Sequence, residues 1–262
     1  MKSRRTGRQK EGSGQSAAEG PGDRVFFCRN GDVTYTSDGS FIYAEKGGET
    51  VRLDLFERHY YKLRPCNGVP ILEVDGLRMQ LIRDFRTPLD YADEVVKGLR
   101  MHGRPGSRGA VVLDTCMGLG YTAIAAAKNP EVRAVITCEV SPAVVSLAKW
   151  NPFSSALWKK DSRMTLMEGS IAELIKTFDD GQFQFVIHDP PRFSHAPELY
   201  SLDFYKELRR VCDGGARIFH YVGSPGRGKD RHIKREVSQR LLEAGFRKPV
   251  YSARLQGIFA SR

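Results

Sequence analysis

Short apolar runs alternate with longer amphipathic segments from Ala110 to the last residue, Arg262. Each run has the length of a buried strand, and the segments between runs carry apolar residues at the spacing of one helix face. Strands and helices that alternate in this way form a parallel sheet with helices on both faces. The strands are predicted at Ala110–Asp114, Ala134–Glu139, Met164–Glu168, Phe183–His188 and Ala216–Val222, and the helices at Tyr121–Asn129, Ser141–Trp150, Ser170–Phe178, Leu202–Cys212 and Lys229–Ala244. A terminal β-hairpin around Gln256-Gly257 is expected to close the chain.

Residues 25–83 follow a different pattern, in which short aromatic or alternating runs are separated by pairs such as Asp75-Gly76. Such pairs adopt the positive φ angles that tight hairpins require. We therefore predict a small β-rich N-terminal domain over residues 25–83. Within it, Val69–Val74 and Leu77–Arg83 are expected to pair as a hairpin, and residues 54–63 to contain a helical turn.

The remaining segments are a linker and a tail. Residues 84–109 are predicted to connect the two domains, with a helix over Tyr91–Leu99. Residues 1–24 are rich in Gly, Ser, Lys and Arg and show no hydrophobic periodicity, which is typical of a disordered basic tail. A targeting segment is the alternative for residues 1–24. The α/β domain is predicted to occupy residues 110–262.

Composition narrows the class of protein. No apolar run is long enough to span a membrane, and no secretory signal is visible, so a cytoplasmic location is expected. The five cysteines are scattered and the six histidines have no metal-ligand spacing, which argues against a disulfide scaffold or a metal site. The net charge of +10 is concentrated in the tail and the C-terminal third. It favours a polyanionic partner such as RNA, although many basic proteins are only soluble enzymes.

A glycine-rich turn follows the first strand of the α/β domain. Asp114 ends that strand, and Gly118 and Gly120 precede the helix. The glycines let a ligand approach the backbone, next to the free N–H groups of a helix N-terminus. A carboxylate there would repel a pyrophosphate but attract a cationic amino-acid group, and Glu139 can accept hydrogen bonds from two ribose hydroxyls. The pattern favours S-adenosyl-L-methionine (SAM) over the two alternatives, a nicotinamide dinucleotide and a turn with no ligand.

These residues resemble the cofactor-binding motif of class I SAM-dependent methyltransferases. The resemblance extends over the α/β domain and implies a Rossmann-like sheet. It implies that Asp114, Gly118 and Gly120 line the methionine side of SAM and that Glu139 binds the ribose. Ser170 stands where that family often has an acidic residue beside the adenine amine, so Ser170 is expected to bind the cofactor there.

A second motif, Asp189-Pro190-Pro191-Arg192-Phe193, follows a predicted strand. Two prolines cannot continue a central strand, so the chain must leave the sheet at the edge where open α/β sheets bind ligands. The motif resembles the Asp-Pro-Pro-aromatic segment of methyltransferases that modify nucleobase or amide nitrogens. It implies that Asp189 and the Pro190 carbonyl hold the target nitrogen beside the cofactor, that Asp189 also binds the cofactor, and that Phe193 stacks on the base. The alternative is a turn that Asp189 merely caps.

Other polar side chains lie near this motif. Two histidines, His188 and His195, flank it and could transfer a proton, although a packed or surface role is the more common one. A basic run after the fifth predicted strand is expected to emerge at the same edge, where it could bind RNA phosphates or simply form a solvated helix face. The residues predicted to bind the substrate are Arg192, Arg227, Lys229 and Arg231.

A competing resemblance points to the polyamine aminopropyltransferases, the spermidine synthases. Gln80, Asp84, Tyr91 and Glu94 resemble the N-terminal hairpin and linker of that family, in which Gln and Asp residues bind the donor and the amine. Three departures argue against the activity. The glycine loop of that family is absent, its Asp-Ser-Ser-Asp segment is replaced by Asp-Pro-Pro-Arg, and a net charge of +10 lowers the affinity for a polycationic substrate.

Together these patterns predict a SAM-dependent methyltransferase that acts on a nitrogen of tRNA, rRNA or a ribonucleoprotein. The combination most resembles an uncharacterised group of predicted archaeal methyltransferases with spermidine-synthase-like architecture. The alternatives are a polyamine aminopropyltransferase and a SAM-binding module without catalysis. No residue pattern indicates an oligomeric state.

Overall fold

The computed structural model describes residues 24–101, 109–160, 163–223 and 232–262. The predicted tail, apart from its last residue, lies outside these ranges. So does most of the basic run that contains Arg227, Lys229 and Arg231. Within the described ranges, no helix is both long and apolar enough to cross a lipid bilayer.

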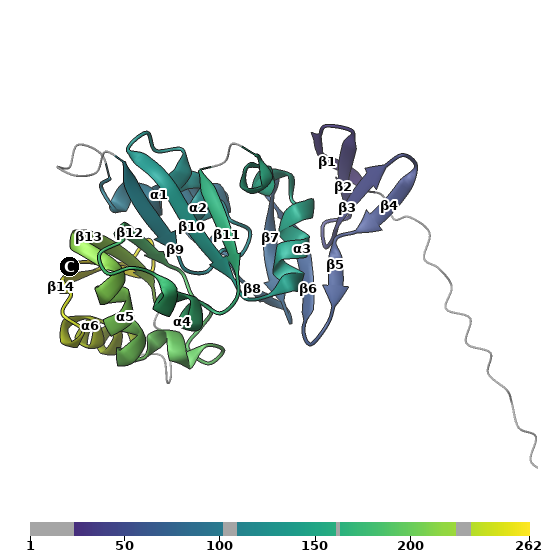
Figure 1. Ribbon diagram of the computed structural model, residues 1–262. Coiled ribbons are helices and arrows are strands. Elements are labelled where there is room, and N and C mark those ends of the chain that lie inside the picture. Colours follow the sequence, from purple (N-terminus) through teal and green to yellow (C-terminus); the bar gives the residue numbers. More distant parts are fainter. Residues whose placement is uncertain (1–23, 102–108, 161–162, 224–231) are drawn as a thin grey trace, which may run out of the picture.

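A seven-stranded sheet forms the centre of the α/β domain, with the order β11-β10-β9-β12-β13-β15-β14 (Figure 1). The first five strands in this order run parallel, whereas β15 runs antiparallel to both of its neighbours. The predicted α/β sheet and its terminal hairpin are confirmed. The strands are β9 (Ala110–Asp114), β10 (Val132–Glu139), β11 (Met164–Glu168), β12 (Phe183–His188), β13 (Cys212–Tyr221), β14 (Arg247–Ser252) and β15 (Gly257–Ser261).

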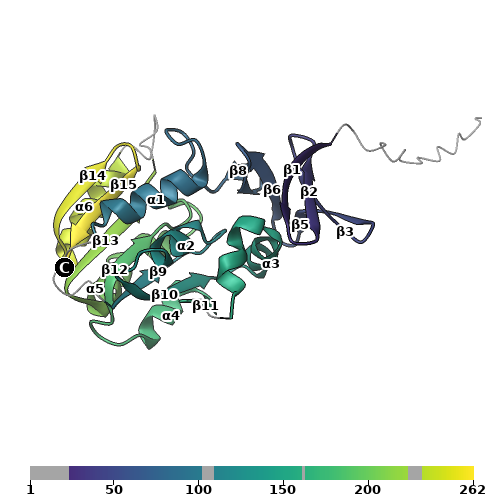
Figure 2. The ribbon, with the colours of Figure 1, turned by 90° about the horizontal axis from the view of Figure 1, so that it is seen from above.

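Helices cover both faces of this sheet, because alternate side chains of each strand point to opposite faces. Along β9, Val112 belongs to one apolar cluster and Leu113 to the other. Figures 1 and 2 show α1 and α2 on one side of the sheet and α4 and α5 on the other. The helices are α1 (Pro88–Gly98), α2 (Tyr121–Ala127), α3 (Pro142–Trp150), α4 (Ile171–Leu174), α5 (Leu202–Val211) and α6 (Ile233–Glu243), and the 3-10 helices are η1 (Pro152–Trp158), η2 (Ile175–Thr177) and η3 (Pro197–Tyr200).

Two four-stranded antiparallel sheets make up the N-terminal region, in the orders β1-β2-β3-β4 and β5-β6-β7-β8. The predicted helical turn in residues 54–63 is wrong, because β5 and β6 fill most of that segment. Its side chains alternate with a period of two: Tyr61 and Leu63 are buried, and Lys62 between them is not. The strands are β1 (Val25–Asn30), β2 (Val33–Ser37), β3 (Ile42–Lys46), β4 (Glu49–Arg52), β5 (Asp54–Phe56), β6 (Tyr60–Cys66), β7 (Val69–Val74) and β8 (Leu77–Arg78).

The hairpin of β7 and β8 ends sooner than its sequence predicts, at Arg78. The Met79 N–H still donates to the Leu72 carbonyl at 2.9 Å. The Leu72 N–H donates to the side-chain Oε1 of Gln80 at 2.7 Å. A side chain therefore takes the place of a backbone carbonyl in the ladder, and the amide of Gln80 is fixed beside β7.

Buried and partly buried hydrogen bonds join the N-terminal sheets to the α/β domain. The Tyr121 hydroxyl donates to the Pro70 carbonyl of β7 at 2.7 Å, and the Tyr35 hydroxyl of β2 donates to the Trp150 carbonyl at 2.9 Å. Figure 1 shows α3 beside the strands β6 and β7, and α3 contacts β6. The two parts thus share one packed interface, and β7 lies against the helix that follows the glycine turn.

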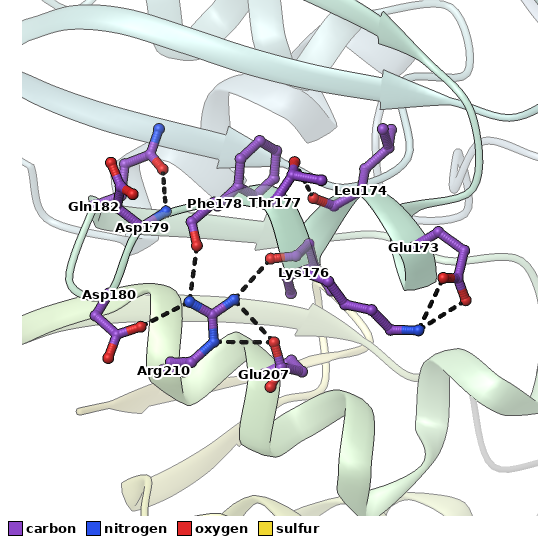
Figure 3. A network of polar contacts seen from close by, with 11 residues as sticks. Glu173, Leu174, Lys176, Thr177, Phe178, Asp179, Asp180, Gln182, Glu207 and Arg210 are labelled. Carbon is purple, nitrogen blue, oxygen red and sulfur yellow. Dashed lines mark hydrogen bonds and ion pairs between the residues drawn. The ribbon is translucent and has the colours of Figure 1, made fainter.

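Two predicted helices differ in detail. The segment predicted as one helix over Ser170–Phe178 divides into α4 and the tighter η2. Arg210 of α5 binds the end of η2, where its guanidinium donates to the Ile175 carbonyl at 2.9 Å and the Phe178 carbonyl at 2.7 Å (Figure 3). The same guanidinium pairs with Asp180 and Glu207. The second helix, α6, begins at Ile233, and the portion predicted at residues 229–231 is not among the described residues.

We expect Arg210→Ala to lower the free energy of unfolding by about 2 kcal/mol, because two carbonyls lose their charged donor. Urea denaturation followed by circular dichroism measures this value. Lys206→Ala is the matched control, since Lys206 belongs to an exposed pair with Asp203 at 3.7 Å and should change stability by less than about 0.5 kcal/mol. Equal effects of the two substitutions would contradict the role given to Arg210.

Candidate active site

The strand order reverses between β9 and β12. Strands β10 and β11 continue on the β9 side of this point, and β13 continues on the β12 side. Ligands bind at such a reversal in open α/β sheets, outside the carboxyl ends of the strands. Asp114 pairs in register with Ile187 of β12, so Asp189 lies just beyond the same edge, and Glu139 ends the neighbouring strand β10. The sheet therefore brings three predicted site residues to one place.

Asp114 is fully buried beneath the glycine turn. Its two oxygens accept hydrogen bonds from the Thr122 hydroxyl of α2 at 2.8 Å and from the Thr137 hydroxyl of β10 at 2.6 Å. Burial raises the pKa of Asp114 to about 7, the charge of Glu139 adds to the rise, and the two threonines lower it. Asp114 thus holds α2 and β10 together from below. The predicted contact between Asp114 and a ligand stays a prediction.

Glu139 holds the glycine turn from the side. Its carboxylate accepts the Gly118 N–H at 2.9 Å and the Ser141 N–H at 3.0 Å. Burial raises its pKa, and the backbone N–H groups act in the opposite direction. Each oxygen keeps a second lone pair, because a carboxylate can accept about four hydrogen bonds. Glu139 can therefore bind hydroxyl groups without releasing the turn.

The two glycines of the turn have different reasons to be glycine. Gly120 has a φ of 76°, and a Cβ on it would lie 2.4 Å from Leu157 Cδ1. Gly118 has a φ of 53°, but the nearest atom to its would-be Cβ is Gln80 Nε2 at 3.8 Å. At Gly120 the side chain of Leu157 already occupies the space that a Cβ would need. At Gly118 that space is open and borders the Gln80 amide of the N-terminal domain. Sequence analysis assigned Gln80 only through the competing resemblance.

Asp189 lies at the edge of the sheet between Asp114 and the helix α1. Burial raises its pKa to about 7, the charge of Asp114 adds to the rise, and the nearby Tyr91 hydroxyl lowers it. Tyr91 is buried, with 4% of its surface exposed, and its hydroxyl makes no hydrogen bond of good geometry to a described residue. A buried hydroxyl without a partner costs roughly 1–3 kcal/mol. Its position beside Asp189 marks a place where a ligand atom would complete the polar contacts.

Tyr221 at the end of β13 also faces this carboxylate. Burial raises the pKa of Tyr221 to about 12, the negative charge of Asp189 adds to the rise, and the positive charge of Arg192 opposes it. No sequence motif indicates Tyr221 or the two threonines at Asp114. Their contacts depend on strand register and on packing between distant segments.

The remaining residues of the Asp-Pro-Pro motif are arranged unevenly. Pro190 is buried, whereas Pro191, Arg192 and Phe193 are exposed. The Pro191 carbonyl accepts the Tyr200 hydroxyl at 2.8 Å, and the ring of Phe193 lies edge-on to Tyr200 with centroids 5.5 Å apart. These contacts fix the turn after Asp189 and leave the Phe193 ring 44% exposed.

His188 has the packed role that sequence analysis gives as the more common one. His188 is fully buried, with Nδ1 at 2.7 Å from the Thr115 hydroxyl and Nε2 at 3.1 Å from the Leu199 carbonyl. A carbonyl can only accept, so Nε2 carries the proton and Nδ1 accepts from Thr115. Burial lowers the pKa of His188 to about 4, which keeps the ring neutral. His195 is exposed and lies 3.0 Å from the Ser194 hydroxyl.

Two further predictions concern residues at the borders of the site. Ser170 is the N-cap of α4 with no side-chain capping bond. The adjacent Gly169 N–H donates to the Glu139 carbonyl at 2.8 Å, so Ser170 lies beside the end of β10, where an adenine contact stays a prediction. Arg227, Lys229 and Arg231 are not among the described residues. Across the described parts of the chain, no group of three His, Cys, Asp or Glu side chains could hold a metal ion.

Comparison with solved structures identifies the class of fold. A spermidine synthase in complex with the transition-state analogue AdoDATO has a TM-score of 0.64 and 17% identity, and covers 81% of this chain and 75% of its own. Spermidine synthase from Thermotoga maritima has a TM-score of 0.61, with the same identity and coverage. The chain therefore has the spermidine synthase fold, a Rossmann-like sheet preceded by β-rich sheets.

Sequence comparison identifies the family. No family model matches the chain. The uncharacterised protein MJ1233 of Methanocaldococcus jannaschii is 42% identical over 225 residues, which cover 82% of this chain and 74% of that protein. The chain belongs to the family of MJ1233. Polyamine aminopropyltransferase 2 of Streptomyces coelicolor is 28% identical over 157 residues, or 58% of this chain, and the match spans only 28% of that protein.

These findings correct the predicted function. The prediction of a methyltransferase that acts on a nitrogen of RNA or a ribonucleoprotein is wrong. The chain is instead similar in sequence to a polyamine aminopropyltransferase and in fold to spermidine synthases. These similarities favour the competing resemblance. The Asp-Pro-Pro motif was assigned to nitrogen methylation through a local resemblance that does not extend to the N-terminal domain. RNA as a binding partner stays a prediction.

We expect Thr137→Val to lower the free energy of unfolding by about 1–3 kcal/mol, because the buried Asp114 loses a donor. The Thr137 hydroxyl stabilises the ionised carboxylate, whose pKa is about 7. The loss should therefore be larger at pH 8.5 than at pH 5.5. Thr165→Val, at an exposed position of β11, is the control in the same urea titrations. A pH-independent loss would show that Thr137 acts only through packing.

Proposed function

We propose that this chain is an aminopropyltransferase, which transfers an aminopropyl group from decarboxylated SAM to an amine. One observation carries the proposal. At the reversal of strand order, the Asp189 carboxylate, with a pKa of about 7, lies beside the buried hydroxyl of Tyr91, which has no well-aligned hydrogen-bond partner among the described residues. This pair can accept a proton from an amine and orient its nitrogen. The similarity to the named aminopropyltransferase of Streptomyces coelicolor supports the same reaction class.

The charges of the site favour a donor without a carboxylate. Asp114, Glu139 and Asp189 each feel burial that raises the pKa, and neighbouring carboxylates raise the pKa values of Asp114 and Asp189 further. A cation relieves this repulsion, whereas the carboxylate of SAM would add to it. Decarboxylated SAM carries a sulfonium and an ammonium group and no carboxylate. It therefore fits this cluster better than SAM does.

This local field outweighs the net charge of +10, which by itself disfavours a cationic substrate. Interactions between exposed charges are screened within about 10 Å at 0.1 M salt. Partly buried carboxylates within the site act at shorter range and in a lower dielectric. Basic residues elsewhere on the surface change the encounter rate more than they change the affinity at the site.

Other groups of the site match the parts of a nucleoside. The free lone pairs of Glu139 can accept the ribose hydroxyls, and Val140 directly after it is 66% exposed and offers apolar surface to a base. The Gln80 amide beside Gly118 offers a donor from the N-terminal domain. Decarboxylated SAM would supply a carbon that is activated by its bond to a positively charged sulfur.

The transfer requires little of the protein beyond positioning and one proton acceptor. The Asp189 carboxylate first takes a proton from the substrate ammonium group and passes it to water, which frees the lone pair of the amine. That lone pair then forms a C–N bond to the carbon next to sulfur while the C–S bond breaks, the sulfur leaves as a neutral thioether, and the product nitrogen carries the positive charge. A carboxylate with a pKa near 7 is suited to this task at neutral pH.

We expect Asp189→Asn to reduce aminopropyl transfer by at least 100-fold, because the proton acceptor is lost, with a smaller loss for Tyr91→Phe. The measurement is release of 5′-methylthioadenosine from decarboxylated SAM in the presence of amines, resolved by liquid chromatography. Asp203→Asn, an exposed residue of α5, is the matched control. Release of S-adenosylhomocysteine from SAM instead, or no product with either donor, would contradict the proposed reaction.

Affinity for the donor should rise with pH between about 5 and 7 and level off above 7. Bound cations favour the ionised carboxylates, so protonation of Asp114 and Asp189 below their pKa of about 7 weakens binding. Each pH unit below 7 is worth up to tenfold per group, and we expect an overall change of roughly tenfold or more. Isothermal titration at several pH values measures this change. The neutral thioether 5′-methylthioadenosine is the control ligand, and an identical pH profile for both ligands would contradict the electrostatic account.

A further inference from the structure

Arg192 is an exposed cation next to the acidic site, and no described residue pairs with it. Its side chain has no ion pair, hydrogen bond or aromatic contact with any described residue. Its backbone, by contrast, is fixed, because the Arg192 carbonyl accepts the His195 N–H at 2.8 Å. The preceding Pro191 carbonyl is held by Tyr200. An arginine with an anchored backbone and an uncommitted guanidinium is available to a ligand.

The charges of Arg192 and Asp189 both act on the Tyr221 hydroxyl. The Tyr221 hydroxyl feels the positive charge of Arg192 and the negative charge of Asp189 in opposite directions. Arg192 also follows Asp189 by three residues along a turn whose backbone is pinned. The site thus changes sign over a short distance, from carboxylates at the strand ends to a guanidinium toward the surface.

We propose that the acceptor is a primary amine whose far end carries an anionic group, a carboxylate or a phosphate, bound by Arg192. This inference rests on the proposed function and specifies the substrate class. With the amine nitrogen at Asp189, the other end of a short acceptor extends toward Arg192. A second ammonium would be repelled there, whereas an anion forms a charge-assisted pair with the guanidinium.

Three four-carbon primary amines that differ in charge at the far end test the role of Arg192. Isothermal titration in the presence of 5′-methylthioadenosine compares 4-aminobutyrate, 1-aminobutane and 1,4-diaminobutane, and 3-aminopropyl phosphate tests phosphate against carboxylate. We expect the native protein to bind an anionic amine at least roughly fivefold more tightly than the diamine, since an exposed charge pair is worth about 1 kcal/mol. Arg192→Asp should reverse this order. Arg235→Asp, an exposed arginine of α6, makes the same charge change and should leave the order unaltered.

The binding measurement does not depend on turnover. Arg192-dependent binding of an anionic amine without any aminopropyl transfer would support the inference and refute the proposed function. Preferred binding and modification of 1,4-diaminobutane, unaffected by Arg192→Asp, would overturn the inference and leave the proposed function intact. Binding of all the amines without any effect of the Arg192 charge, or no binding of any of them, would overturn the inference as well.

Discussion

The burial of carboxylates at the point where the strand order reverses is the constraint on which the rest of the site depends. Asp114 ends β9 and Asp189 directly follows the neighbouring strand β12, so sheet register brings two negative charges together in a poorly solvated place. Two threonine hydroxyls offset part of this cost at Asp114, and backbone N–H groups offset part of it at Glu139. Among the described residues, Asp189 has the poorly aligned Tyr91 hydroxyl alone to offset this cost. The repulsion that remains is the driving force for binding a cation.

The N-terminal sheets complete this arrangement. Gln80 reaches the glycine turn because its own amide replaces a backbone group in the ladder of β7. The Tyr121 hydroxyl fixes β7 against α2 and also accepts the side-chain N–H of Asn151 at 2.9 Å. Substitutions in this interface would move the Gln80 amide beside Gly118 without touching Asp189, so the β-rich domain belongs to the candidate site as well as to the fold.

The sequence predicts those parts of the fold and the site that depend on neighbouring residues in the chain. The strand that ends at Asp114, the glycine turn, the strand that ends at Glu139 and the departure of the chain at Asp189 all follow from apolar periodicity and from Gly and Pro chemistry. Thr137 and Tyr221 could not be found in this way, because their contacts arise from strand register and from segments far apart in the chain. Tyr91 and Gln80 were visible only through resemblance to aminopropyltransferases, and the net charge, which describes the whole surface, argued against that resemblance. The local charge of the site has the opposite sign.

The most direct test of the account is the ionisation of Asp189 itself, followed by carbon-13 NMR of labelled aspartate carboxylates in the native protein and in Asp189→Asn, which assigns the signal. The account predicts a midpoint near pH 7 for the free protein and a midpoint at least one pH unit lower when decarboxylated SAM is bound. An Asp189 that titrates near the ordinary aspartate value of about 4, or a midpoint that the donor does not move, would contradict it.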